Sequence, residues 1–169
     1  MKRGWVMAMV LAGLVSAGCQ REASTGPFEL SGRLFVFNYR ISQASYLVTL
    51  KRIGPVAEGM QARVRFENPA GGTVLEIRQK LFPAQDKLVL ESPPLTCVRK
   101  DRPYSVAIDI LDQDEKLVQE LKTSVTSDLD QSVLPARLIV TGPAYQRNDA
   151  AFDRNGNPVA KSMEGCPAR

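Results

Sequence analysis

The side chains that could carry chemistry in this 169-residue chain are three cysteines and two groups of acidic residues. The cysteines are Cys19, Cys97 and Cys166, and the chain contains no histidine. Without histidine, Ser-His-Asp and Cys-His nucleophile systems, histidine general bases and most zinc-enzyme ligand sets are excluded. Neither Cys97 nor Cys166 lies in a C-x-x-C motif, so we expect no cysteine-bound metal.

The acidic groups lie at residues 109–115 and in the stretch DRNGNP, residues 153–158. Two carboxylates about 5 to 10 Å apart across a cleft can hydrolyse a glycosidic bond, but a solvated hairpin turn explains Asp112, Asp114 and Glu115 more simply.

DRNGNP resembles a calcium loop, yet its glycine comes fourth rather than sixth. Asn-Gly is first a turn former. No GxGxxG or P-loop motif is present. We therefore predict no catalytic residue, no metal and no cofactor.

The first 18 residues have the pattern of a secretory signal peptide. Lys2 and Arg3 precede an uncharged stretch, residues 4–18, that ends in small residues. A transmembrane helix needs about 20 apolar residues, and this stretch is too short before the polar residues that follow Cys19. We expect residues 1–18 to be removed and the rest of the chain to be exported.

Ser16, Ala17, Gly18 and Cys19 resemble the lipobox of bacterial lipoproteins, in which small residues precede a cysteine that is acylated and becomes the mature N-terminus. The resemblance implies a palmitate-type lipid anchor on Cys19 and a polar tether over residues 19–27. Because Gln20 is not the aspartate that this family associates with inner-membrane retention, it also implies the outer membrane. The same residues satisfy the A-x-A-like rule for ordinary signal cleavage, which would release a soluble secreted protein beginning at Cys19.

Cysteine parity connects the anchor with the other two thiols. An odd number of cysteines in a secreted chain leaves one reactive thiol, whereas acylation of Cys19 leaves Cys97 and Cys166 as a pair. Export places this pair in an oxidising compartment, so we predict a Cys97–Cys166 disulfide that ties the C-terminal tail to the folded domain. The alternative is two separate buried or free thiols.

Composition fits one globular domain with flanking segments. Hydrophobic residues make up 44% of the chain and charged residues 24%, close to globular averages. The formal net charge is +4, of which Lys2 and Arg3 contribute two units, so +2 remains for the exported part. This charge is too small to indicate nucleic-acid binding.

Alternating apolar and polar residues predict a series of short strands. QARVRFE, residues 61–67, places Ala62, Val64 and Phe66 on one face, and the turn NPAGG joins it to a second strand at residues 73–81. Residues 116–126 fit either a helix or a strand, but the β-branched residues at their end and the preceding DQDEK turn favour a strand. The remaining predicted strands are residues 28–38, 44–53, 87–91, 104–111 and 137–141.

This layout resembles bacterial immunoglobulin-like and fibronectin-type domains over residues 28–142. The resemblance implies an all-β fold, a single antiparallel β-sandwich at residues 28–142 with an irregular C-terminal tail at residues 143–169. The only tryptophan is Trp5, so the Cys…Trp…Cys core of an antibody-type domain is absent.

We therefore expect a non-catalytic cell-envelope lipoprotein whose β-sandwich, facing the periplasm or the cell surface, is a binding or structural module for another envelope protein. Fold analogy does not name that partner. One alternative is a carbohydrate-active or hydrolytic envelope enzyme that uses Asp or Glu, which would need a concave site with converging carboxylates. The other is a soluble secreted binding domain, if Cys19 is not acylated.

Overall fold

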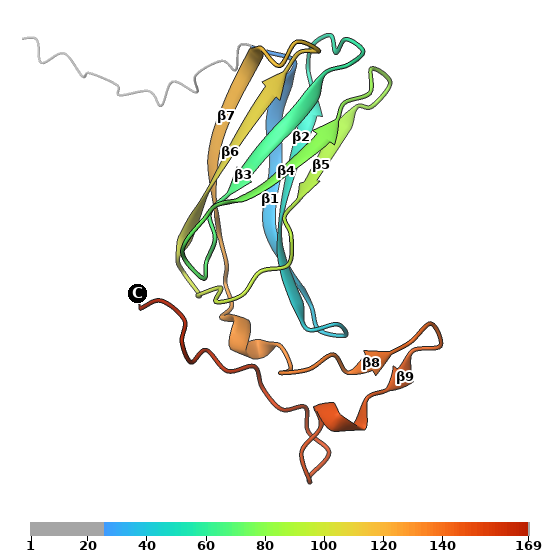
Figure 1. Cartoon of the computed structure of the whole chain (residues 1–169), viewed down its shortest axis with the longest axis vertical. Coiled ribbons are helices and arrows are strands. Elements are labelled where there is room, and N and C mark those ends of the chain that lie inside the picture. Colours follow the sequence, from blue (N-terminus) through green and yellow to red (C-terminus); the bar gives the residue numbers. More distant parts are fainter. Residues whose placement is uncertain (1–25, 169) are drawn as a thin grey trace, which may run out of the picture.

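The computed structural model describes residues 26–168, and this part of the chain folds into strands with two short 3-10 helices (Figure 1). The predicted signal peptide and Cys19 lie outside the described residues. Within residues 26–168, no helix has the length and apolar character needed to cross a membrane. The elements are β1 (Phe28–Asn38), β2 (Gln43–Arg52), β3 (Gln61–Phe66), β4 (Leu75–Lys80), β5 (Lys87–Glu91), β6 (Pro103–Leu111), β7 (Leu117–Thr126), η1 (Gln131–Val133), β8 (Val140–Thr141), β9 (Gln146–Arg147) and η2 (Asp149–Ala151).

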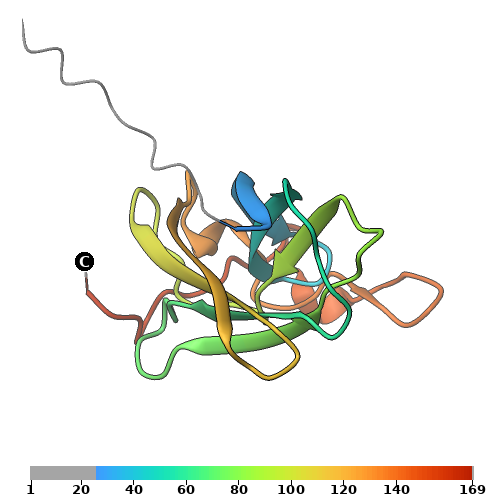
Figure 2. The ribbon, with the colours of Figure 1, turned by 90° about the horizontal axis from the view of Figure 1, so that it is seen from above.

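Seven strands form two antiparallel sheets that stack face to face (Figure 2). One sheet has the order β1-β2-β5 and the other the order β4-β3-β6-β7. The predicted all-β, antiparallel sandwich is therefore confirmed. Constant-type immunoglobulin domains pair their fourth strand with the fifth, whereas here β4 pairs with β3 and so belongs to the sheet of β3, β6 and β7.

The core between the sheets is filled by the inward-facing residues of each strand. Ala62, Val64 and Phe66 are fully buried, as their alternation predicts. The Tyr46 ring stacks on Phe66 with 5.5 Å between centroids. Large aromatic side chains thus occupy the centre that a tryptophan fills in antibody-type domains.

Tyr104, near the start of β6, ties its strand to the loop before it. Its Oη accepts a hydrogen bond of 2.8 Å from the backbone N–H of Arg99, five residues upstream. This arrangement matches the tyrosine corner of immunoglobulin-like sandwiches. The Tyr46 hydroxyl instead donates to the Glu67 carbonyl at 3.0 Å, so both buried phenols have polar partners.

The stretch that fitted either a helix or a strand is β7, which forms a hairpin with β6. Asp112 shapes the turn, because its Oδ1 accepts hydrogen bonds of 2.9 Å from the backbone N–H groups of Asp114 and Lys116. Glu115 completes the turn with φ of 59°. The register of the hairpin shifts between Ile110 and Leu111, next to the turn. Leu117 is therefore exposed, although in a regular strand it would lie on the same face as the inward-facing Leu121.

The sandwich ends earlier than the predicted boundary at residue 142. Its last strand finishes at Thr126, and the strand expected at residues 137–141 is only Val140–Thr141, which pairs with β9 outside the two sheets. Pro135 and Pro143 flank this segment, and proline cannot donate to a ladder, so a longer strand is disfavoured there. The β8–β9 hairpin projects from the end of the sandwich opposite to the start of β1 (Figure 1).

Candidate functional site

The C-terminal segment is held to the sandwich by a disulfide between Cys97 and Cys166. The S–S distance is 2.04 Å and the Cα atoms are 5.4 Å apart. Cys97 lies in the connection between β5 and β6, and Cys166 lies close to the last described residue. The predicted pairing is present, and it ties the tail back to the domain as expected.

Residues 134–168 follow η1, and we call this segment the C-terminal cap. Backbone hydrogen bonds hold it against the sandwich. Leu134 is fully buried in the hydrophobic core, and its carbonyl accepts a hydrogen bond of 2.8 Å from the N–H of Lys161. The N–H of Ile139 donates to the carbonyl of Arg40 at 2.9 Å, which joins the cap to the β1–β2 turn. The cap is therefore a hydrogen-bonded layer across one end of the sandwich, and most of its side chains are exposed.

Gln131 connects the last strand of the sandwich to this layer. The residue is fully buried on η1, and its backbone N–H donates to the Val98 carbonyl at 2.9 Å. Its side-chain Oε1 accepts from the Val98 N–H at 3.0 Å, while Nε2 donates to the Leu95 carbonyl at 2.6 Å. Three hydrogen bonds thus fix η1 against the loop that carries Cys97.

Exposed aromatic and basic residues lie on the β1–β2 turn and on the segment of the cap that is hydrogen-bonded to this turn. Tyr145 at the tip of the β8–β9 hairpin is 69% exposed, and the Arg40 guanidinium lies 6.0 Å from its ring centroid. Within residues 26–168, neither Arg40 nor Arg137 takes part in an ion pair. We call this set the Tyr-Arg surface; its members are Tyr39, Arg40, Arg137, Leu138 and Tyr145.

Arg147 stiffens the hairpin that presents Tyr145. Its guanidinium carbon lies 3.8 Å from the Phe152 ring centroid, and its Nε donates to Asp149 Oδ1 at 3.0 Å. Arg147 also pairs with Val140 across the β8–β9 ladder. A stacked guanidinium is held in one orientation, so the hairpin has an internal support besides its backbone pairing.

The DRNGNP stretch forms a turn, as the Asn-Gly pair predicts. Asp153 Oδ1 accepts hydrogen bonds of 2.9 Å from the N–H groups of Asn155 and Asn157, and Gly156 adopts φ of 81°. This pattern repeats the turn at Asp112. In the described part of the chain, no group of three or more His, Cys, Asp or Glu residues is arranged to hold a metal ion.

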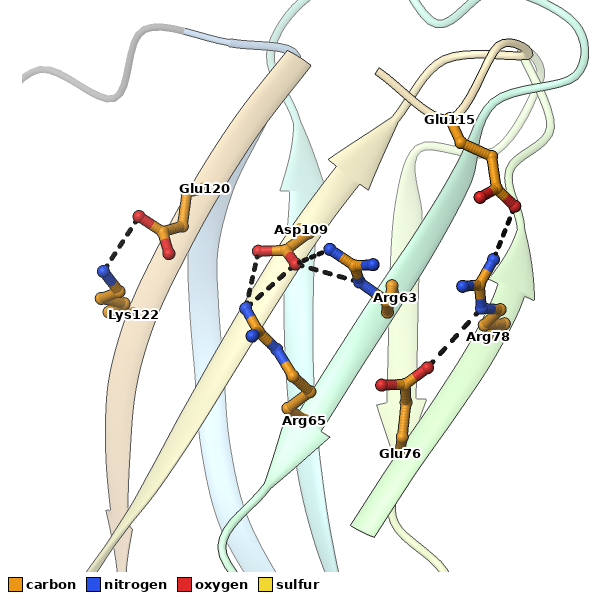
Figure 3. A network of polar contacts seen from close by, with 8 residues as sticks. All are labelled: Arg63, Arg65, Glu76, Arg78, Asp109, Glu115, Glu120 and Lys122. Carbon is orange, nitrogen blue, oxygen red and sulfur yellow. Dashed lines mark hydrogen bonds and ion pairs between the residues drawn. The ribbon is translucent and has the colours of Figure 1, made fainter. Parts of the chain in front are cut away.

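The outer face of the four-stranded sheet carries a network of ion pairs centred on Asp109 (Figure 3). Asp109 is 3% exposed and accepts hydrogen bonds from Arg63 Nη2 at 2.7 Å and from Arg65 Nη2 at 3.0 Å on the same oxygen, Oδ2. The other oxygen, Oδ1, accepts from Arg65 Nη2 at 3.2 Å. The hydrogen bond to Asp109 raises the pKa of the Arg63 guanidinium.

The acidic residues that sequence reasoning singled out therefore have separate structural partners. Asp109 binds two arginines on the sheet face, Asp112 holds the β6–β7 turn, and Glu115 pairs with Arg78 at 2.8 Å. Glu115 and Asp109 lie on the same side of the sheet but point to different arginines (Figure 3). This arrangement is typical of a solvated, ion-paired sheet surface.

Neither the Tyr-Arg surface nor the role of Gln131 was predicted from the sequence. The stretch GPAY between Thr141 and Gln146 contains turn residues that could have indicated the β8–β9 hairpin. Nothing in the local sequence marks Gln131, because its importance comes from burial against a loop more than 30 residues away.

No protein-family model matches this chain. A search of curated proteins also finds no match. The class that the structure defines is an all-β sandwich protein with a disulfide-held C-terminal cap.

Proposed function

We propose that this protein is a non-catalytic lipoprotein of the cell envelope, anchored to the outer membrane through Cys19, whose β-sandwich presents the C-terminal cap to another envelope protein. The observation that carries the proposal is the position of the Tyr-Arg surface. Its residues belong to the β1–β2 turn and to the disulfide-held cap, at the end of the sandwich opposite to the start of β1 (Figure 1).

The distance along the chain supports an anchor that leaves this surface free. Gly26 follows Cys19 by seven positions, and a fully extended chain of that length spans at most about 25 Å. A lipid on Cys19 would thus hold the sandwich close to the bilayer by the end that lacks the cap. Several acyl chains, at about 0.8 kcal/mol for each buried methylene, give stable attachment.

The composition of the Tyr-Arg surface supports protein binding. Tyrosine and arginine are enriched at the centres of protein interfaces, where they supply most of the binding free energy. Tyr145 offers a large exposed ring, and Arg40 and Arg137 offer positive charges without ion-pair partners in the described chain. A protein surface rich in Asp or Glu is the partner that this chemistry fits.

The ion pairs of Asp109 favour binding over hydrolysis as the function. Glycoside hydrolysis needs two carboxyl groups facing each other across a cleft, whereas Asp109 is ion-paired with Arg63 and Arg65 on the face of the sheet. No observation on the described residues favours the enzyme alternative over the binding module.

Affinity purification with cross-linking from detergent-solubilised envelopes tests this function. The full-length chain should enrich one envelope protein, and the double variant Arg40→Ala, Tyr145→Ala should lose at least about 90% of that enrichment, as expected for interface anchors. The matched control is Phe82→Ala, which removes another exposed aromatic ring, 61% exposed, outside the Tyr-Arg surface. If the double variant and the control enrich the same partner equally, the Tyr-Arg surface is not the binding site.

A further inference from the structure

The strand β5 forms one edge of the three-stranded sheet and carries the sequence KLVLE. The Asp86 carbonyl accepts from Arg52 N–H at 2.9 Å, and Ser92 N–H donates to the Tyr46 carbonyl at 3.1 Å, both toward β2. Because backbone groups alternate in direction along a strand, the N–H and C=O groups of Lys87, Val89 and Glu91 point away from the sheet. β5 therefore presents an edge that can be paired.

We propose that β5 pairs with β5 of a second copy of this chain. The two strands are antiparallel and are related by a twofold axis that passes between the two Val89 residues. In that register Val89 lies opposite Val89 of the second copy, and Lys87 lies opposite Glu91 of the second copy. These are the three residues whose backbone groups point outward, so every outward N–H and C=O of β5 finds a partner. The pairing joins two three-stranded sheets into one sheet of six strands.

The charges on β5 are complementary to themselves under this twofold axis. Lys87 and Glu91 stand on the same face at equal distances from Val89, so each lysine of the pair meets a glutamate. Opposite charges directly across two antiparallel strands stabilise the pairing. The same symmetry is what a closed, isologous dimer requires.

Lys87 lacks a carboxylate partner within residues 26–168. Its cross-strand neighbour on β2 is Lys51, a like charge, and Lys51 pairs with Glu29 at 3.3 Å. Like charges directly opposite are unfavourable, so Glu91 of a second copy would supply the missing charge. The hydroxyl of Ser45 donates to Glu91 Oε1 at 2.7 Å, which holds this carboxylate on the outer face of the sheet.

Apolar side chains continue across the proposed junction. Val89 is 45% exposed, and two such side chains would meet at the twofold axis. On the same outer face, Leu34 and Leu47 lie opposite each other on β1 and β2, and Leu34 is 48% exposed. This face thus differs from the outer face of the other sheet, which ion pairs cover (Figure 3).

A comparison with the edge strand β4 shows why self-pairing favours β5 over β4. β4 also places opposite charges, Glu76 and Lys80, at equal distances from a central residue. That central residue is Arg78, so a twofold pairing of β4 would bring two guanidinium groups together. Charged centres of this kind protect edge strands from pairing, whereas the centre of β5 is an uncharged valine.

The pairing depends only on residues of β5 and is independent of the lipid anchor.

Charge exchange tests the pairing. We would measure the mass of the purified full-length chain by sedimentation equilibrium over a range of concentrations, in a buffer whose density matches the detergent. The wild-type chain should approach twice the monomer mass. Lys87→Glu and Glu91→Lys should each weaken self-association by at least about tenfold, because each places like charges opposite one another. The double variant Lys87→Glu, Glu91→Lys should restore the dimer, because the charges are complementary again.

Lys80→Glu on the edge of β4 is the matched control and should leave the dimer intact. Far-UV circular dichroism and the melting temperature should show that all variants fold, since the exchanged side chains are exposed. Three results would overturn the proposal: a wild-type chain that stays monomeric at every concentration, a dimer that both single variants retain, or a double variant as monomeric as the single ones.

Discussion

Gln119 on β7 and Phe28 on β1 exchange two hydrogen bonds: Gln119 Nε2 donates to the Phe28 carbonyl at 2.7 Å, and the Phe28 N–H donates to Gln119 Oε1 at 3.1 Å. The buried side-chain amide of Gln119 thus makes the two hydrogen bonds that a neighbouring strand would otherwise make to Phe28. It joins the first strand of one sheet to the last strand of the other. The start of the sandwich, next to the predicted tether, depends on this contact.

Replacing Gln119 with alanine should lower the free energy of unfolding by about 2–4 kcal/mol, because two buried backbone groups of Phe28 lose their partners. Gln119→Glu keeps an acceptor but loses the donor and places a carboxylate against the Phe28 carbonyl at a buried position, so its loss should be at least as large as that of the alanine variant. Urea denaturation measures both. An alanine variant within 0.5 kcal/mol of the wild type (about the size of a neutral surface substitution) would show that the contact contributes little.

The Cys97–Cys166 disulfide should be essential for the order of the C-terminal cap. The bond joins residues 69 positions apart, and a loop of that length corresponds to about 4 kcal/mol in the chain-entropy account. The double variant Cys97→Ser, Cys166→Ser should lose stability by that order and expose residues 134–168 to protease. Non-reducing peptide mapping of the wild-type protein should recover the two cysteines in one fragment. Two alkylatable thiols in protein from the envelope would contradict the pairing.

Tyr46 should make the fold sensitive to alkaline pH. Burial raises the pKa of its phenol above the value of 10.0 that an unperturbed tyrosine has. A group whose folded-state pKa is raised contributes stability below the unfolded pKa and loses it as pH rises. Stability should therefore fall above pH 10 by up to about 1.4 kcal/mol per pH unit from this group.

The variant Tyr46→Phe lacks the titrating hydroxyl, so its unfolding free energy should decline less steeply between about pH 9 and 11. Its stability at neutral pH should be lower than that of the wild type by about 1 kcal/mol, because the bond to the Glu67 carbonyl is lost. Equal slopes for the two proteins would rule out Tyr46 as the source of alkaline sensitivity.

The β6–β7 turn offers a stabilising substitution. Glu115 adopts φ of 59°, a conformation that costs a residue with a side chain about 1 kcal/mol relative to glycine. Glu115→Gly also removes the exposed pair with Arg78, which contributes only about 0.2–1 kcal/mol. We expect the free energy of unfolding of Glu115→Gly, measured by thermal denaturation, to rise by up to about 0.8 kcal/mol. Asp114→Gly is the control and should show no such rise. A loss of stability would mean that the ion pair outweighs the backbone effect.

Most of the strands could be predicted from the sequence because inward-facing and outward-facing residues alternate along them. β1 and β5 have the predicted bounds, and β3 buries the three residues that alternation selects. The DQDEK turn resolved whether residues 116–126 form a helix or a strand. An aspartate favours a tight turn through hydrogen bonds to its own local backbone, and a tight turn joins two strands. Local alternation was sufficient in these places.

The cap could not be predicted in the same way, because its order comes from distant contacts. β8 and β9 have two residues each, too few for a periodic signal. Leu134 and Gln131 are single residues whose partners lie across the sandwich or in the loop near Cys97. The Tyr-Arg surface likewise combines residues about 100 positions apart, so only the fold brings them together.

Intact-mass analysis of the wild-type protein from the membrane fraction tests the proposed lipoprotein most directly. The account predicts a chain that begins at Cys19, lacks residues 1–18 and carries the added mass of acyl chains, and it predicts that Cys19→Ser releases or mislocalises the protein. An unmodified Cys19 in the membrane fraction, or a chain that retains residues 1–18, would contradict it.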